Sequence, residues 1–211
     1  MPVLESLTMA LTAETLRTAV ARAAETARAV EDELNVADGK LGDGDTGVML
    51  RRLFEKLSTS VPRDQEDLGV LFQALGSASA SATGSSLGTL VTVSMLTLAK
   101  ETRGRTDLPW SELGSLLEKV RDVMMARGGA ALGDKTVVDA LDAVATAIGG
   151  VGDPGEIRTK ARQAAQRSLD AFRQMPNRLG RARMFADRSI GLDDPGMLAF
   201  SRLLDGLAAE R

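Results

Sequence analysis

The chain has 211 residues, of which 44% are hydrophobic and 26% charged, with a formal net charge of −3. This length and composition predict an ordinary soluble protein with a single domain over residues 1–211. Basic and acidic residues are interspersed and aromatic residues make up only 3%, which argues against a nucleic acid partner. The sequence has no His and no Cys, so any chemistry must use carboxylates, hydroxyls, Lys, Arg and backbone dipoles.

Hydrophobic segments give no sign of a membrane protein. Each apolar stretch is interrupted by polar residues before it reaches about 18 residues, the length that a membrane span needs. The first residues also lack the basic region that precedes the apolar run of a signal peptide. We therefore expect a cytoplasmic protein without membrane contact.

Apolar residues at intervals of three and four predict a first helix over residues 13–35, with Thr12 as its N-cap. In chain order, further helices are expected over about 46–58, 65–79, 90–100, 112–127, 135–148, 154–174 and 195–210. The residues expected to cap four of these helices are Ser111, Asp134, Asp153 and Asp194. Sustained strand alternation is absent, and residues 179–194 are expected to be irregular. The sequence thus predicts an all-α bundle of seven or eight helices.

Residues 38–47, between the first two predicted helices, hold four glycines and the carboxylates of Asp38, Asp43 and Asp45. Carboxylates this close repel one another unless a cation lies among them. Oxygen ligands without His or Cys favour Mg²⁺, Ca²⁺ or Mn²⁺ over zinc. A helix that starts near Thr46 directs its positive end toward whatever the metal holds. The pattern therefore indicates a metal and phosphate site.

This loop has two other interpretations. A solvated acidic turn is common between helices, and spacing alone does not decide between it and a metal site. A calcium-binding EF-hand is excluded, because counting from Asp43 places Phe54 where the bidentate Glu of that loop is required.

Residues 79–89 are small and rich in hydroxyl groups. They suit either close packing between helices or a loop that opens a helix toward an anion, and the first interpretation is favoured from this segment alone. Alternate loops of an up-and-down bundle lie at the same end. We therefore expect the loops over 38–47, 83–89, 128–136 and 180–196 to meet.

The motif Asn35…Asp38…Asp43-Gly44-Asp45…Gly47 resembles the signature of the nucleotide-binding L subunit of dihydroxyacetone kinases, here called the DhaL type. Three later blocks agree with that family in order and spacing. They are Gly84-Ser85-Ser86, the segment 133–141, and the segment 180–196. The resemblance thus extends over most of the chain. The acidic loop is also similar to that of fatty-acid kinases, which are much longer proteins.

The resemblance implies an eight-helix antiparallel barrel with a nucleotide site at one end. Asp38, Asp43 and Asp45 would hold two Mg²⁺ ions that bridge the phosphates of ATP or ADP. The residues implied to contact phosphate are Thr46, Gly47, Val48, Met49, Ser85 and Ser86. Those implied to shape the adenine and ribose pocket are Gly128, Val137, Arg181, Asp194, Pro195 and Gly196. No catalytic residue is expected beyond the metal ligands.

The resemblance also implies an incomplete enzyme, because the acceptor sugar is held by a His of a separate K-type subunit and this chain has no His. We expect a kinase subunit that transfers a phosphoryl group from ATP to the terminal hydroxyl of dihydroxyacetone or a related ketose. Thr46 stands where phosphotransferase-dependent members often have His, which favours ATP as donor. Leu87 and Leu192 also depart from the family pattern.

Several alternatives stay open. The other functions compatible with the sequence are an ADP-cofactor subunit served by a phosphotransferase protein, a nucleotide-binding regulatory protein and a plain helical interaction domain. A homodimer is a further open alternative for the assembly.

Overall fold

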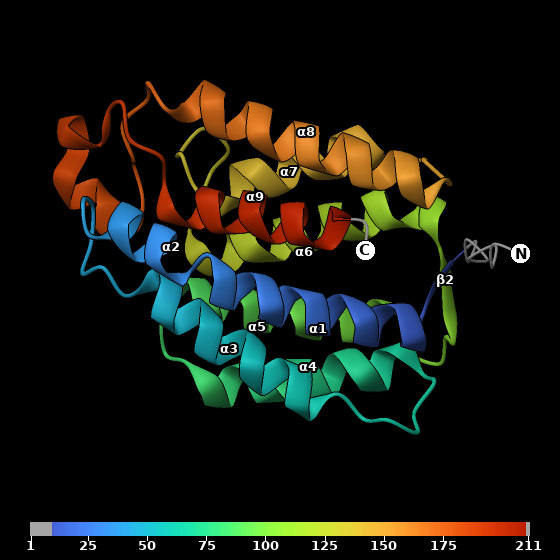
Figure 1. Cartoon of the computed structure of the whole chain (residues 1–211). Coiled ribbons are helices and arrows are strands. Elements are labelled where there is room, and N and C mark those ends of the chain that lie inside the picture. Colours follow the sequence, from blue (N-terminus) through green and yellow to red (C-terminus); the bar gives the residue numbers. More distant parts are fainter. Residues whose placement is uncertain (1–9, 210–211) are drawn as a thin grey trace, which may run out of the picture.

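The computed structural model describes residues 10–209, apart from the side chains of Arg181 and Ala186. In this part of the chain the structure is almost entirely helical (Figure 1). The α-helices are α1 (Ala13–Ala29), α2 (Glu31–Asp38), α3 (Thr46–Ser60), α4 (Leu68–Ala82), α5 (Ser86–Glu101), α6 (Leu113–Gly128), α7 (Val137–Ile148), α8 (Pro154–Phe172) and α9 (Pro195–Ala208). Short 3₁₀ helices are η1 (Trp110–Glu112) and η2 (Arg181–Ser189), and short strands are β1 (Ala10–Thr12) and β2 (Asp107–Pro109). The predicted all-α class is confirmed.

The helices form a closed ring. From α3 to α9 each helix packs against the next in the chain, and α9 returns to pack against α1, which in turn packs against α3. The short helix α2 continues α1 and packs against α3 and α9. The ring of α1 and α3–α9 is therefore the expected eight-helix barrel, with α2 as an extension at one end.

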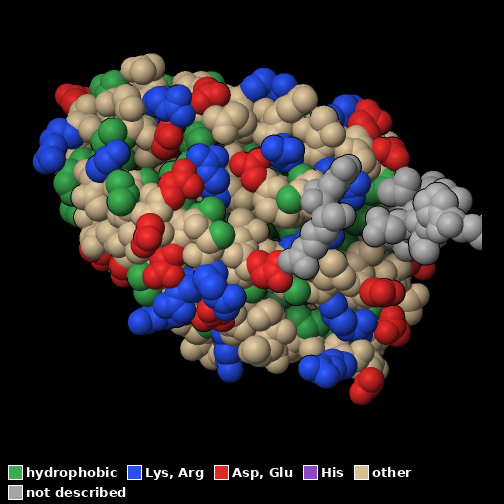
Figure 2. Space-filling model, viewed as in Figure 1, with side chains coloured by type: hydrophobic (Ala, Val, Ile, Leu, Met, Phe, Trp, Pro, Cys, Tyr) green, Lys and Arg blue, Asp and Glu red, His purple; other side chains and the backbone are tan. Residues whose placement is uncertain are grey.

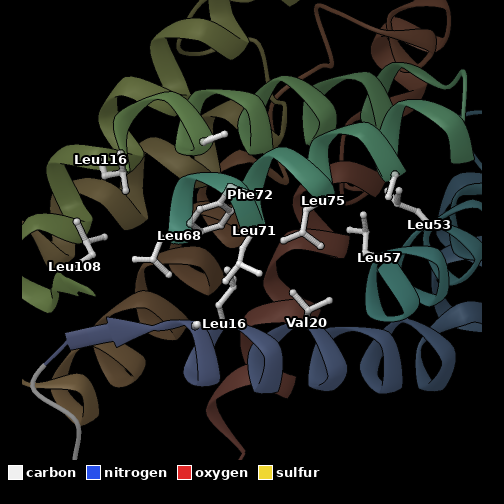
Figure 3. Packing of buried hydrophobic residues seen from close by; sticks show 13 residues of the cluster. Leu16, Val20, Leu53, Leu57, Leu68, Leu71, Phe72, Leu75, Leu108 and Leu116 are labelled. Carbon is white, nitrogen blue, oxygen red and sulfur yellow. The ribbon is translucent and has the colours of Figure 1, made fainter. Parts of the chain in front are cut away.

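The interior of the ring is filled by aliphatic side chains. In the cluster of Figure 3, Leu16 and Val20 of α1 lie close to Leu71 of α4, and the same cluster continues through Leu57 of α3. Each buried leucine side chain contributes roughly 1.5–3 kcal/mol relative to an exposed one. The three-and-four spacing of these residues is the pattern that predicted the helices, because it places them on one face of each helix.

The expected first helix, over 13–35, is divided at Val30. That residue ends α1 with φ −103° and ψ 8°, and α2 then extends to Asp38. Neither Gly nor Pro marks the break. At Gly47 of α3 an added Cβ would lie 2.0 Å from the Glu31 carbonyl oxygen, so α2 and α3 touch through their backbones. Because α2 extends to Asp38, this residue lies at the end of a helix, whereas the sequence predicted it in a loop.

The helix starts agree in part with the expected caps. Asp153 and Asp194 cap α8 and α9 as predicted, by accepting hydrogen bonds from the Glu156 and Met197 N–H groups. The expected cap Asp134 was wrong, because α7 begins two residues later behind Thr136. Ser111 was wrong as well, since it lies inside η1, which precedes α6.

Other boundaries also differ. The helix expected from residue 65 begins at Leu68, behind the cap Asp67. The helix expected from residue 90 begins four residues earlier, at Ser86 behind the cap Ser85. The irregular segment 179–194 contains η2.

A two-stranded antiparallel pairing joins β1 to β2, with Ala10 opposite Pro109 and Thr12 opposite Asp107. Strands of three residues are too short to produce the alternation by which strands are recognised, so they were not predicted. Within residues 10–209, no helix is long and apolar enough to cross a membrane.

The loops expected to meet lie at one end of the barrel, on the left in Figure 1. The Arg178 N–H donates to the Asp134 carbonyl oxygen at 3.0 Å, which joins the loop before α7 to the segment after α8. Leu87 at the start of α5 packs in the same apolar cluster as Leu34 of α2 and Leu198 of α9. This end of the barrel, opposite the β1–β2 pair, carries the candidate site.

Candidate functional site

Three aspartates converge between α2 and α3. One carboxylate oxygen from each of Asp38, Asp43 and Asp45 lies within 4.8 Å of the other two. Asp38 is buried, whereas Asp43 and Asp45 are exposed. An oxygen-only set with one fixed and two accessible carboxylates fits a hard divalent cation such as Mg²⁺, which usually keeps several of its waters.

The Asp38 carboxylate is held by the backbone of the acidic loop. Its Oδ2 accepts hydrogen bonds from the N–H groups of Gly44, Asp45 and Thr46 at 3.0, 3.0 and 3.3 Å. A Cβ at Gly42 would lie 2.6 Å from Asp38 Oδ1, so only glycine leaves that oxygen its place. Oδ2 is thus committed to the fold, and Oδ1 is the oxygen suited to a metal.

Asn35 is a site residue that was quoted in the motif but not assigned a role from sequence. Its Oδ1 accepts hydrogen bonds from the N–H groups of Gly47 and Val48 at 2.9 and 3.2 Å. Asn35 on α2 therefore caps α3, a task usually done by the residue just before a helix. The i,i+3 spacing of Asn35 and Asp38 was the available signal, since it places both on one face of a helix.

The backbone N–H groups expected to contact phosphate at the start of α3 already donate hydrogen bonds within the protein. The N–H groups of Thr46, Gly47 and Val48 donate to Asp38 or Asn35, and the Met49 N–H donates to the Asp45 carbonyl oxygen at 2.9 Å. These amides are all occupied in the structure. A phosphate contact from this helix start is therefore left to the Thr46 hydroxyl.

The start of α5 is different. Ser85 accepts the Gly88 N–H at 3.0 Å and receives the Thr83 hydroxyl at 3.1 Å. The N–H groups of Ser86 and Leu87 have no acceptor among the described residues. Both earlier interpretations of this segment apply. Ser79 bonds Thr92 across α4 and α5 at 2.8 Å, and the first turn of α5 still presents two free amides.

A second polar group forms around the start of α9. Asp194 accepts hydrogen bonds from the Met197 N–H at 2.9 Å and from Asn177 Nδ2 at 2.8 Å. Burial raises the pKa of the Asp194 carboxyl to about 6, although those bonds, the Gly196 N–H and the charge of Lys135 act in the opposite direction. Gly196 lies against Val137, since a Cβ there would be 3.5 Å from the Val137 Cβ.

The remaining expected pocket residues lie at the same end. Pro195 is the first residue of α9 and Gly128 the last residue of α6, where a Cβ would be 3.7 Å from Leu90 of α5. Arg181 begins η2, and its side chain lies outside the described residues. Asn177 and Lys135, both buried beside Asp194, were not predicted as site residues. Lys135 lies in the family block 133–141, but no role was assigned to it, and Asn177 lies outside the blocks.

The surface beside the aspartates is apolar in places. A groove of about 380 Å³ lies between α2 and the segment before α9, with Val36, Lys40 and Leu192 in its lining. Exposed large hydrophobic side chains at this end are Val36, Leu132, Met184 and Ile190. Figure 2 shows the same mixture on its left, where hydrophobic side chains lie among Lys, Arg and acidic residues. A larger groove, of about 430 Å³, lies between α5 and α6, and its lining does not include Asp38, Asp43 or Asp45.

An all-helical barrel with an acidic cluster among its loops defines the class of this protein. The family model described as the DAK2 domain matches residues 40–209, and the chain belongs to this family. The resemblance to the nucleotide-binding subunit of dihydroxyacetone kinases is thereby confirmed at family level. The match begins just after Asp38.

Two relatives illustrate the family. The ADP-binding subunit DhaL of the PEP-dependent dihydroxyacetone kinase of Escherichia coli is 28% identical over 81% of this chain and 84% of its own length. The L-erythrulose kinase of Pectobacterium atrosepticum is 28% identical over 84% of this chain. The chain spans only 31% of that second, longer protein.

Two solved structures share the fold. The dihydroxyacetone kinase of C. freundii in its native form superposes with a TM-score of 0.73 at 23% identity, over 99% of this chain and 36% of that one. The same kinase in complex with AMP-PNP and Mg²⁺ gives a TM-score of 0.70 at 24% identity over the same shares. The predicted barrel is confirmed by this similarity.

Proposed function

We propose that this chain is the Mg²⁺- and nucleotide-binding subunit of a dihydroxyacetone-type kinase. In the proposed reaction the terminal hydroxyl of a small hydroxyketone attacks the γ-phosphorus of ATP. The new O–P bond forms while the bond to the β,γ-bridging oxygen breaks, and ADP leaves. The acceptor would be dihydroxyacetone or a four-carbon ketose held by a separate K-type subunit. The hydroxyl proton would pass to a base of that subunit or to a spare carboxylate oxygen of this chain.

The observation that carries this proposal is the cluster of Asp38, Asp43 and Asp45, with one oxygen of each within 4.8 Å of the others. These carboxylates would hold Mg²⁺, with two ions as the family resemblance implies. Bound there, the metal would neutralise phosphate charge, which is the main requirement of phosphoryl transfer. The AMP-PNP and Mg²⁺ of the related C. freundii structure support this choice of ligands.

The chain's own residues would orient the nucleotide. The free amides of Ser86 and Leu87 and the Thr46 hydroxyl suit phosphate oxygens, since a helix start attracts anions. The base and ribose would be enclosed by Gly128, Val137, Arg181, Asp194, Pro195 and Gly196. The distribution of exposed apolar side chains favours a docked partner at this end, where Val36, Met184 and Ile190 are accessible.

The test is coupled turnover with the purified chain, a K-type subunit encoded beside it, Mg²⁺ and ATP. We expect ketose phosphate to form only when both subunits and the metal are present. A complete mixture that yields no ketose phosphate, with dihydroxyacetone and erythrulose each offered, would refute the kinase proposal.

A second candidate is an ADP-cofactor subunit that is rephosphorylated by a phosphotransferase protein. It is favoured by one observation, that the chain spans 84% of the E. coli ADP-binding subunit but under a third of the erythrulose kinase. Nucleotide exchange separates the two candidates. Rapid release with micromolar to millimolar affinity supports a co-substrate, whereas ADP that survives purification supports a cofactor.

A further inference from the structure

Lys135 is a fully buried lysine in the loop before α7. Its side chain is 0% exposed, and its Nζ donates to the carbonyl oxygens of Met175, Ser189 and Arg173 at 2.7, 2.8 and 3.3 Å. An ammonium group has three N–H donors, so each one has an acceptor here. This buried ammonium therefore contributes to the folded structure through its bonds to the backbone.

The three carbonyls come from the two ends of one segment. Arg173 and Met175 follow α8, and Ser189 ends η2, so the ammonium closes the chain between them. The Gly191 N–H also donates to the Arg173 carbonyl oxygen at 2.8 Å. Lys135 therefore fixes both ends of the segment 173–191 to the loop before α7.

Asn177 joins this arrangement to the start of α9. Its Nδ2 donates to the Lys135 carbonyl oxygen at 2.9 Å and to Asp194 Oδ2 at 2.8 Å. Its backbone N–H donates to the Ser189 hydroxyl at 2.8 Å. Main chain and side chain of Lys135 are thus both connected to residues that place Asp194.

The backbone of Lys135 supports a role for its side chain. Its φ of 60° is the one positive value at a non-glycine position among the described residues. Glycine or asparagine adopts this conformation more readily than lysine does. Burial lowers the pKa of the ammonium, while the carboxylates of Asp194 and Asp193 raise it. A lysine at this place is costly for both backbone and solvation, and its three hydrogen bonds offset that cost.

We propose that Lys135 is a positioning residue of the nucleotide site, in which its ammonium acts as a built-in cation that fixes the segment 173–194 and thereby Asp194, Pro195 and Gly196. This inference rests on the proposed nucleotide-binding function. The acid cluster is built from the end of α2 and the loop before α3, so its affinity for Mg²⁺ should not depend on Lys135.

The test compares the native chain with Lys135→Ala and with the control Lys160→Ala, which removes a partly exposed lysine of α8 that pairs with Glu156. Hydrogen–deuterium exchange without nucleotide reports on the segment itself. Affinity for a fluorescent ATP analogue with Mg²⁺ reports on the site. Binding of Mg²⁺ alone, followed by calorimetry, reports on the acid cluster.

We expect K135A to exchange amides of residues 175–194 at least tenfold faster, with α3–α5 unchanged, and to bind the ATP analogue at least tenfold more weakly. Affinity for Mg²⁺ alone should stay within twofold of the native value. Added 1-propylammonium replaces the three carbons and the nitrogen that the substitution removes, so it should restore slow exchange. Tetramethylammonium has the same charge but no N–H donors, and it should not.

Native exchange rates in K135A would overturn the proposal, as would fast exchange combined with native nucleotide affinity. Should K135A not fold, Lys135→Gln takes its place, because it keeps N–H donors but removes the charge. The same faster exchange and weaker nucleotide binding are expected of it. If the native chain itself binds no nucleotide, the proposed function fails, and the exchange measurement alone still decides whether Lys135 fixes the segment.

Discussion

Two polar groups lie at the same end of the barrel, and their side chains bond to the backbone in opposite directions. In the acid cluster, the side chains of Asn35 and Asp38 accept backbone N–H groups. In the Lys135 group, an ammonium donates to backbone carbonyls. The first collects three carboxylates, whereas the second places its cation near Asp193 and Asp194. Under the proposed function, the first group binds a cation from solution, whereas the second already contains the ammonium of Lys135.

The strongest test of this difference is Asp38→Ala. The substitution removes a proposed metal ligand and also the acceptor of three backbone N–H groups. We expect kinase turnover to fall by on the order of a hundredfold or more, because charge neutralisation is lost. We also expect the metal-free chain to lose about 3 kcal/mol of stability, since hydrogen bonds to a charged acceptor are lost. Coupled turnover and urea unfolding measure the two effects.

Asp43→Asn is the matched variant for that experiment. Asp43 is exposed whereas Asp38 is buried, so substitution of Asp43 should lower metal-free stability by less than D38A does, while turnover falls as it does in D38A. If the two variants lose equal stability without metal, Asp38 does not have the structural role that its three hydrogen bonds indicate.

Ligand addition gives the next largest effect. Saturating Mg-ADP should stabilise the native chain by about 3–4 kcal/mol, because it binds only the folded state. For a protein of this size the melting temperature should rise by several degrees. Differential scanning calorimetry with Mg-ADP, ADP plus chelator, and Mg²⁺ alone measures this shift. An unchanged melting temperature in all three conditions would favour a plain helical interaction domain.

A smaller effect is expected for Asn35→Leu, which keeps the size of the side chain but removes the acceptor of the Gly47 and Val48 N–H groups. Loss of a helix cap costs about 1–2 kcal/mol. Mg²⁺ affinity should also decrease, because α3 then holds Asp45 less firmly. Urea unfolding and Mg²⁺ titration are the measurements. A variant with native values in both would show that Asp38 alone maintains the start of α3.

The comparison also explains what the sequence could predict. Helices were predictable because buried residues recur at three-and-four spacing, as Leu16 and Val20 do in α1. The aspartates were predictable because all three lie within eight residues, so local spacing alone brings them together. The DhaL-type motif added the later blocks, which no local rule connects.

The features missed depend on contacts between distant segments. Nothing at Val30 signals a helix end; the structure instead brings Gly47 against the Glu31 carbonyl oxygen. Asp134 is an ordinary cap residue, but its Oδ2 accepts the Ala131 N–H, and Thr136 caps α7. Lys135 is bonded to carbonyls 38 to 54 residues away, a distance at which sequence pattern carries no information.

The smallest effect concerns pH. It tests whether the hydrogen bonds and the Lys135 charge around Asp194 outweigh the cost of burying its carboxylate. Burial raises the pKa of Asp194 from 3.8 to about 6, so the folded state binds more protons than the unfolded state between these values. Stability contributed by Asp194 is therefore present below pH 3.8 and declines as the pH rises to about 6. Asp194→Asn does not titrate, so the native-minus-variant difference in unfolding free energy should fall across this window and be constant above it. Urea unfolding in Mg²⁺-free buffer at several pH values measures the difference. A difference that rises with pH would contradict this prediction. It would mean that Lys135 and Asn177 stabilise the Asp194 carboxylate by more than burial destabilises it.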